Sequence, residues 1–330
     1  MRVVQLQSPS GAKRVAIVEE PKLRLLNECD SVYALCERVL AESRRLAELA
    51  SALVSKETLD YDPVYACQSE WRLLSPWTHP EPARCLVTGT GLTHKASAKN
   101  REAMHCKPEE LSDSMRMYLA GVEGGRPEPG TIGVAPEWFY KGCGTVLRAH
   151  GEPLLVPNFA GDGGEEPEVA GLYIVDAQGQ PRRVGMAMAN EFSDHVVEKQ
   201  NYLYLAHSKL RTCALGPELV IDADFASVPG TVSIERGGAV VWSKAIATGD
   251  PNMAHTIANL EHHHFKYAEH RRPGDAHVHF FGADAFSFGE GIQLQADDVM
   301  VVAFEGFGRP LRNPLAIDRS GQQLVAVPAL

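Results

Sequence analysis

The chain has 330 residues, of which 44% are hydrophobic and 22% are charged. This composition is ordinary for globular proteins and excludes a disordered or collagen-like chain. With 32 basic against 42 acidic side chains, the formal net charge is -10. An acidic chain without a long basic run repels phosphate backbones and anionic lipids, so we expect neither nucleic acid nor a membrane as a partner.

The amino-terminal segment shows no signal peptide, because charged residues and the sequence Ser8-Pro-Ser-Gly11 interrupt its apolar residues. All apolar stretches are shorter than the roughly 20 residues that a membrane-spanning helix needs. The seven cysteines form no CxxC pair, and their odd number favours reduced thiols over a disulfide framework. We therefore predict a cytoplasmic protein.

The first 80 residues predict a small module of mixed helix and strand. Residues 1–20 alternate around a Ser-Pro-Ser-Gly turn, which is typical of a hairpin. Over residues 31–56 apolar side chains recur at helical spacing, which predicts one long amphipathic helix or two helices with a break. Three prolines between residues 76 and 82 interrupt regular structure. We place a domain boundary near residue 80.

Residues 81–330 predict a larger, strand-rich domain, apart from a polar helical stretch at roughly 95–120. The strand candidates are short apolar runs at 84–88, 172–175, 184–188, 219–222, 231–234, 239–242, 276–280 and 298–303. Strands and helices do not alternate as they do in a doubly wound sheet, and no glycine-rich phosphate loop is present. The predicted fold class is α+β, without a nucleotide cofactor.

The most informative segment runs from Glu166 to Glu191. Two apolar strands flank the turn-forming sequence Asp176-Ala-Gln-Gly179, which predicts a β-hairpin. The midpoint between Glu168 and Glu191 falls in this turn, so we expect the two side chains to face each other across the open end of the hairpin. Glu166 stands two residues before Glu168 and shares its face, because side chains alternate along a strand.

Three carboxylates in one place repel one another unless a cation holds them together. Glu166, Glu168 and Glu191 therefore predict a site for a hard divalent ion, with Mg²⁺ as the first choice and Mn²⁺ or Ca²⁺ as alternatives. The competing interpretation is an acidic hairpin base whose glutamates face water, and spacing alone leaves it open.

The same residues resemble the metal motif of the fumarylacetoacetate hydrolase superfamily. In that motif Glu-x-Glu, and a carboxylate after Asn at the end of the next strand, hold Mg²⁺. Here the pieces read Glu166-Pro-Glu168 and Asn190-Glu191, with Glu191 where the family usually has Asp. The resemblance extends from about residue 84 to residue 315. Within the superfamily, the sequence TGTGLTHKAS over residues 88–97 is similar to the branch of 2-keto-3-deoxy pentonate (arabinonate or xylonate) dehydratases.

This resemblance implies a β-rich catalytic domain, a homodimer or larger homo-oligomer, and a lyase of pentose catabolism. The implied reaction is Mg²⁺-dependent dehydration of a 2-keto-3-deoxy pentonate to 2-oxoglutarate semialdehyde. A small 2-keto acid can chelate the ion, which stabilises the enolate formed when the C3 proton leaves, and the C4 hydroxyl then departs as water. Two alternatives stay open: a metal-dependent hydrolase of an acylpyruvate or diketo acid, and a non-catalytic sugar-acid binding protein.

The resemblance also implies which residues surround the ion. Lys209 and His94 are the candidates for proton transfer, since lysine beside a divalent ion can act as an acid or base and imidazole titrates near neutral pH. Lys141 is expected to pair with the substrate carboxylate, and Ser97 and Ser287 to contact its oxygens through their hydroxyls. The alternatives are a surface position for Lys209 and a purely structural role for His94.

Two groups of histidines lie outside this pattern. We interpret His262-His-His264 as a solvated polar segment, because adjacent histidines on a helix point in different directions and do not readily share one ion. His277 and His279 share one face of a predicted strand. No third ligand stands at a recognisable spacing from them, so we favour a structural role for this pair.

Overall fold

The protein is described by a computed structural model that covers residues 1–95, 98–99 and 112–330. The strands are β1 (Arg2–Gln7), β2 (Lys13–Glu19), β3 (Lys22–Leu26), β4 (Val54–Asp60), β5 (Arg72–Leu74), β6 (Cys85–Gly91), β7 (Glu137–Cys143), β8 (Leu147–Arg148), β9 (Leu154–Val156), β10 (Pro167–Val175), β11 (Pro181–Asn190), β12 (Cys213–Val220), β13 (Val228–Arg236), β14 (Ala239–Thr248), β15 (Ala276–Phe280), β16 (Val299–Phe304) and β17 (Leu311–Ile317). The helices are α1 (Val32–Glu42), α2 (Leu46–Ala52), α3 (Tyr61–Tyr65), α5 (Asp113–Gly124), α6 (His195–Gln200), α7 (Leu205–Lys209) and α8 (Ile257–Phe265).

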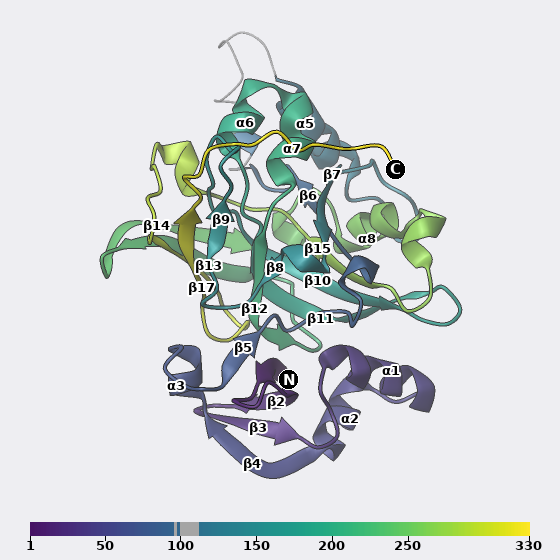
Figure 1. Ribbon diagram of the computed structural model, residues 1–330. Helices are drawn as coiled ribbons and strands as arrows, with labels where there is room; N and C mark the ends of the chain where they lie inside the picture. Colours follow the sequence, from purple (N-terminus) through teal and green to yellow (C-terminus); the bar gives the residue numbers. More distant parts are fainter. Residues whose placement is uncertain (96–97, 100–111) are drawn as a thin grey trace.

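Two sheets organise the described residues. The larger sheet follows the order β4-β3-β2-β1-β12-β11-β10-β15-β6-β7, with β5 and β8 pairing at β1 and β12. The second sheet follows the order β14-β13-β16-β17-β9. Figure 1 shows β1 to β4 with α1 to α3 below the strands that follow them in the sequence. The predicted α+β class is confirmed: the described part of the chain is rich in strands, and helices do not alternate regularly with them along the sequence.

Strands β10 and β11 lie at the centre of the larger sheet and divide its core in two. Every residue of β10 is buried, as its almost continuous apolar sequence requires. Ala170 and Leu172 join a core that includes side chains from α1 and α2, whereas Val169 joins the core formed with the second sheet. Because both faces of this hairpin are buried, its register is strongly fixed.

The amino-terminal elements agree with the expected hairpin and helices. Strands β1 and β2 pair antiparallel, with Val3 opposite Ile17. The helical pattern forms two helices and not one. Ser31 caps α1 by accepting a hydrogen bond from the amide of Ala34, and the helix stops at Ser43, whose φ of 52° lies in the left-handed region. No helix in the described part of the chain is both long and apolar enough to cross a bilayer.

The prediction of a solvated histidine segment is wrong. Helix α8 begins at the Thr256 cap, and its inner face carries Leu260 and His264, which are both fully buried. A nitrogen of the His264 ring lies 3.0 Å from a ring nitrogen of His277, and the His264 ring stacks on that of His279 at 4.4 Å. His264 lies four residues after Leu260, which is about one helical turn, so both side chains lie on the same buried face of α8.

Candidate active site

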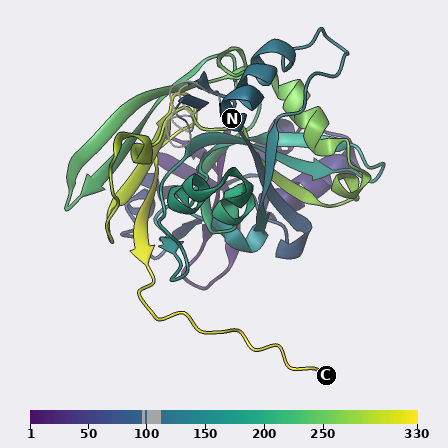
Figure 2. The same ribbon diagram turned by 90° about the horizontal axis from the view of Figure 1, so that it is seen from above.

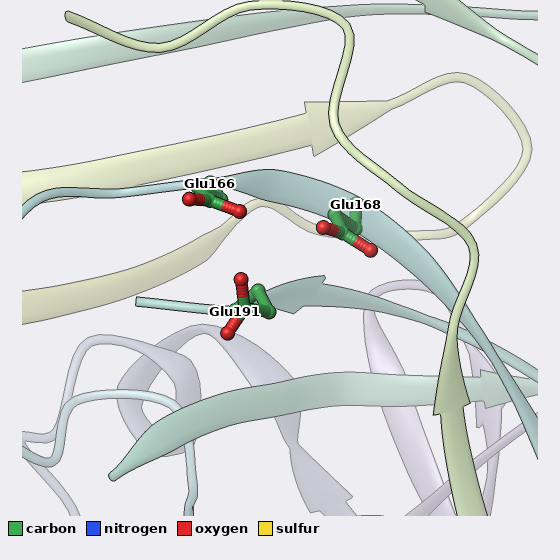
Figure 3. Close-up of side chains that lie close together, drawn as sticks. All are labelled: Glu166, Glu168 and Glu191. Carbon is green, nitrogen blue, oxygen red and sulfur yellow. The ribbon is translucent and has the colours of Figure 1, made fainter. Parts of the chain in front are cut away.

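The three predicted carboxylates meet at the open end of the β10–β11 hairpin. Glu166 directly precedes β10, Glu168 lies within it, and Glu191 directly follows β11. One carboxylate oxygen from each lies within 4.8 Å of the others, and all three residues are buried. Figure 3 shows the carboxylates turned toward a common space. The exposed fractions of Glu166, Glu168 and Glu191 are 6%, 1% and 0%. The alternative of an acidic hairpin base that faces water therefore does not hold.

The expected register of the hairpin is off by two residues. Glu168 pairs with Ala189, and the amide of Glu191 donates to the carbonyl of Glu166 at 2.9 Å. Glu191 therefore lies opposite Glu166 and not Glu168. Because Val175 pairs with Pro181, the turn is centred earlier than the sequence suggested. A bulge in β11, where Val184 is skipped in the pairing, recovers only part of the difference. The carboxylates still converge, since all three lie at one end of the hairpin.

Two buried lysines neutralise part of this cluster. Lys209, at the end of α7, donates to the two oxygens of Glu166 at 2.9 and 2.8 Å and to Glu191 at 2.5 Å. Lys141, on β7, pairs with the other oxygen of Glu191 at 2.5 Å and donates to the carbonyl of Phe192. Lys209 is fully buried, so the alternative of a surface cation does not hold. Lys141 lies against a carboxylate of the protein, whereas the sequence suggested a carboxylate of the substrate.

The pKa values of Glu166 and Glu168 are shifted in opposite directions. Burial alone would raise the pKa of Glu166, but Lys209 and His195 outweigh it and hold the pKa well below its ordinary value. Burial, together with Glu191 and Glu166, raises the pKa of Glu168 well above its ordinary value. In the described part of the chain, Glu168 accepts one hydrogen bond, from the backbone amide of Gly282 at 2.7 Å. No lysine or arginine there forms an ion pair with it.

This imbalance is what a hard cation would correct. A buried carboxylate that lacks a counter-charge is costly, and its cost falls when a positive ion binds beside it. Carboxylate oxygens are the ligands that Mg²⁺ and Ca²⁺ prefer. The residues present therefore fit a divalent ion held by Glu166, Glu168 and Glu191.

Two supporting residues were not identified from the sequence. A ring nitrogen of His195 lies 2.9 Å from Glu166, and its ring stacks on Phe286 with centroids 4.7 Å apart. The Ser193 hydroxyl donates to the oxygens of Glu191 at 3.1 and 2.9 Å. Both residues follow Glu191 within four positions, and this closeness along the chain was the one signal available in the sequence.

The other predicted site residues have different surroundings. The two ring nitrogens of His94 contact the hydroxyls of Thr93 at 2.9 Å and Thr248 at 3.1 Å, and burial lowers the pKa of His94 to about 4. This is the geometry expected of a structural histidine. The hydroxyl and amide of Ser287 donate to Glu165 at 2.9 and 2.6 Å, so that hydroxyl already has an acceptor. Ser97 lies outside the described residues.

Comparison with solved structures identifies the fold. An apo structure of 2-keto-3-deoxy-D-arabinonate dehydratase superposes with a TM-score of 0.72 at 19% identity, over 97% of this chain and 100% of that one. The chain therefore has the fumarylacetoacetate hydrolase superfamily fold. A structure of the same named dehydratase complexed with magnesium and 2,5-dioxopentanoate superposes with a TM-score of 0.71, also at 19% identity and over the same shares of both chains. A 5-carboxymethyl-2-hydroxymuconate delta-isomerase from Mycobacterium smegmatis, at 16% identity, gives 0.59 over 96% of this chain and all of its own.

A curated relative that is also named a dehydratase matches a shorter part of the chain. The probable 2-keto-3-deoxyxylonate dehydratase of Haloferax volcanii is 27% identical over 169 residues. This match spans 50% of the present chain and 51% of the relative, so the chain matches about half of the relative's length. No protein-family model matches the chain. Because dehydratases and an isomerase share this fold, the fold alone does not fix the reaction.

Proposed function

We propose that the protein is a Mg²⁺-dependent hydro-lyase that dehydrates a 2-keto-3-deoxy pentonate to 2-oxoglutarate semialdehyde. The observation that carries this proposal is the buried Glu168, which lies beside two other carboxylates and forms no ion pair with a lysine or arginine of the described residues. A protein keeps such a costly group where it is used to bind an ion or to do chemistry.

The charges of the cluster also suit an anionic keto acid. At their formal charges, and with His195 counted as neutral, the three carboxylates and two ammonium groups carry one net negative charge. A divalent ion would change this to one positive charge, and the carboxylate of a 2-keto acid would then bring the site to neutrality. A buried site favours neutrality, since isolated charges are poorly solvated there. The cluster is thus matched to an ion together with a monoanionic substrate.

Lys209 is the residue that we assign to proton transfer. When bound, a divalent ion would supply Lewis-acid polarisation of the keto oxygen. Lys209 contacts both Glu166 and Glu191, so its Nζ would border a substrate seated on the cluster. Once it has released its own proton, neutral Lys209 would accept the C3 proton and then deliver that proton to the C4 hydroxyl, which departs as water. Lys141 would hold Glu191 in place from the other side.

The names of the similar proteins support the substrate class. The magnesium complex described above also contains 2,5-dioxopentanoate, a five-carbon keto compound. The curated relative carries the name of a dehydratase for a 2-keto-3-deoxy pentonate. Both names agree with the charge pattern of the cluster.

A product assay separates this proposal from its alternatives. The purified protein is incubated with Mg²⁺ and a panel of 2-keto-3-deoxy acids, acylpyruvates and diketo acids, and products are followed by mass spectrometry. We expect the loss of one water from a 2-keto-3-deoxy pentonate, and no turnover after chelation of the metal. Cleavage of an acylpyruvate into two fragments would identify a hydrolase. Tight binding of the sugar acid without turnover would identify a binding protein.

A further inference from the structure

Residues 319–330, which we call the arm, follow β17 and extend away from the folded body, as Figure 2 shows. Residues 321–330 carry no charged side chain and end in the apolar sequence LVAVPAL. The exposed fractions of Leu324, Val325 and Val327 are 98%, 82% and 89%. Contiguous apolar side chains that are fully exposed mark a surface that binds another surface.

An apolar groove lies beside the root of the arm. It has a volume of 490 Å³, and its exposed apolar lining includes Tyr140, Leu155, Phe159 and Leu210. The exposed fraction of Phe159 is 66%, which is high for an aromatic side chain. The lining contains no acidic residue, and its two cationic residues are already paired inside the fold, with Glu191 and Asp194. The groove is therefore suited to a neutral, apolar segment.

The residues at the start of the arm are held against β9 and the segment that follows it. Strand β17 pairs in parallel with β9, which places Ala316 opposite Leu155 in the groove wall. The next residues are then tied down, because Asp318 donates its amide to the carbonyl of Val156 and Asn158 donates to the hydroxyl of Ser320 at 2.9 Å. From this point the arm leaves the body. Among the described residues, none of the arm contributes to the lining of the groove of its own chain.

We propose that the arm of one copy lies in the groove of a second copy of this chain. A second copy offers an apolar groove, whose two cations are already paired within the fold, to an apolar segment without charged side chains. A two-fold arrangement lets both arms and both grooves be filled at once, since the same patch on each subunit meets its counterpart. The proposal thus names the element and the surface through which the chain self-associates, and it is independent of the reaction assigned above.

The test uses the oligomeric state of the full chain, measured by sedimentation velocity over a range of concentrations. An arm variant carries Leu324→Asp with Val327→Asp, and a groove variant carries Leu155→Asp with Phe159→Asp. A control variant carries Ile132→Asp with Val240→Asp, which change two exposed apolar residues outside the groove. We expect both the arm and the groove variants to weaken association by about 100-fold or more, because each buries a charge in an apolar contact. The control should associate like the wild type.

Mixing the arm and groove variants distinguishes exchange between copies from folding back. In an exchanged dimer, the intact arm of the groove variant meets the intact groove of the arm variant, so the mixture should associate more tightly than either variant alone. Circular dichroism melting confirms that each variant is folded. A monomeric wild type, an arm variant that associates normally, or a mixture that gains nothing would each overturn the proposal.

Discussion

Glu168 accepts a hydrogen bond from the backbone amide of Gly282 at 2.7 Å, which ties the start of β10 to the segment after β15. One amide donor does not balance a buried carboxylate that has two others beside it, and the raised pKa of Glu168 reflects this. The electrostatic repulsion within the cluster is therefore greatest at Glu168.

Glu168→Gln should remove ion binding and stabilise the ion-free fold. The amide keeps the size of the side chain and removes the repulsion from Glu166 and Glu191. We expect Mg²⁺ to raise the melting temperature of the wild type and to leave that of the variant unchanged. Without Mg²⁺ the variant should melt higher than the wild type. Glu290→Gln, at an exposed ion pair with Lys244, is the control, and a Glu168→Gln variant that still binds Mg²⁺ in calorimetry would contradict the assignment.

Lys209→Met should separate chemistry from ion binding. We expect turnover to fall by about 10²- to 10⁴-fold, the usual contribution of a positioned acid or base. Mg²⁺ binding should persist, since the three carboxylates remain. Lys209→Arg keeps the positive charge but is a poor proton acceptor, so it should bind Mg²⁺ normally without recovering turnover. Lys199→Met, at an exposed position on α6, should behave as the wild type. Normal turnover in Lys209→Met would rule out its proposed role.

His195→Phe should weaken ion binding without unfolding the protein. The new ring can pack beside Phe286 as the imidazole does, but Glu166 loses the hydrogen bond that orients it. Loss of such a supporting partner lowers metal affinity by about 10- to 100-fold. Calorimetry with Mg²⁺ measures this directly, and Val196→Ala serves as a neighbouring control. An unchanged affinity would show that Lys209 alone orients Glu166.

We expect the free energy of unfolding to fall in mild acid, because His277 and His279 are buried in their neutral form. Burial, reinforced by the neighbouring imidazoles, lowers the pKa of His277 and His279 to about 3. Because these folded-state values lie below the unfolded value of about 6.5, the stabilisation is complete above pH 6.5 and is lost as the pH falls below it. At pH 5.5 each of the two histidines should cost about 1.4 kcal/mol relative to pH 7.5.

Urea unfolding at the two pH values measures this cost. His277→Gln should reduce the difference in unfolding free energy between pH 7.5 and pH 5.5 by about 1.4 kcal/mol, whatever its effect at pH 7.5. His207→Gln changes an exposed histidine and should leave the difference unchanged. Equal pH dependence in the wild type and His277→Gln would show that the buried ring is protonated without cost.

The carboxylates of the site could be predicted because they depend on short-range rules. Alternation along a strand places Glu166 and Glu168 on one face, and a hairpin brings Glu191 back to the same end. The predicted register was wrong because the register depends on the turn geometry and on a bulge in β11, and neither has a clear signal in composition.

The remaining parts of the site depend on tertiary packing. Lys141 and Lys209 approach Glu191 from β7 and from the end of α7, and no local pattern connects those segments. The burial of His264 likewise depends on how α8 lies against β15. The family resemblance pointed to both lysines, but the structure was needed to show that they pair with Glu191.

The pairing of β1 with β12, where Val3 lies opposite Leu219, bears on how the protein can be divided for experiments. The first strand closes the edge of the sheet that carries the carboxylate cluster. Expression of a fragment that starts near residue 80 would expose the backbone of β12, and uncovered strand edges promote aggregation. Strand β1 thus protects the edge of β12 from pairing with other molecules, and shortened versions of the protein should be designed to retain it.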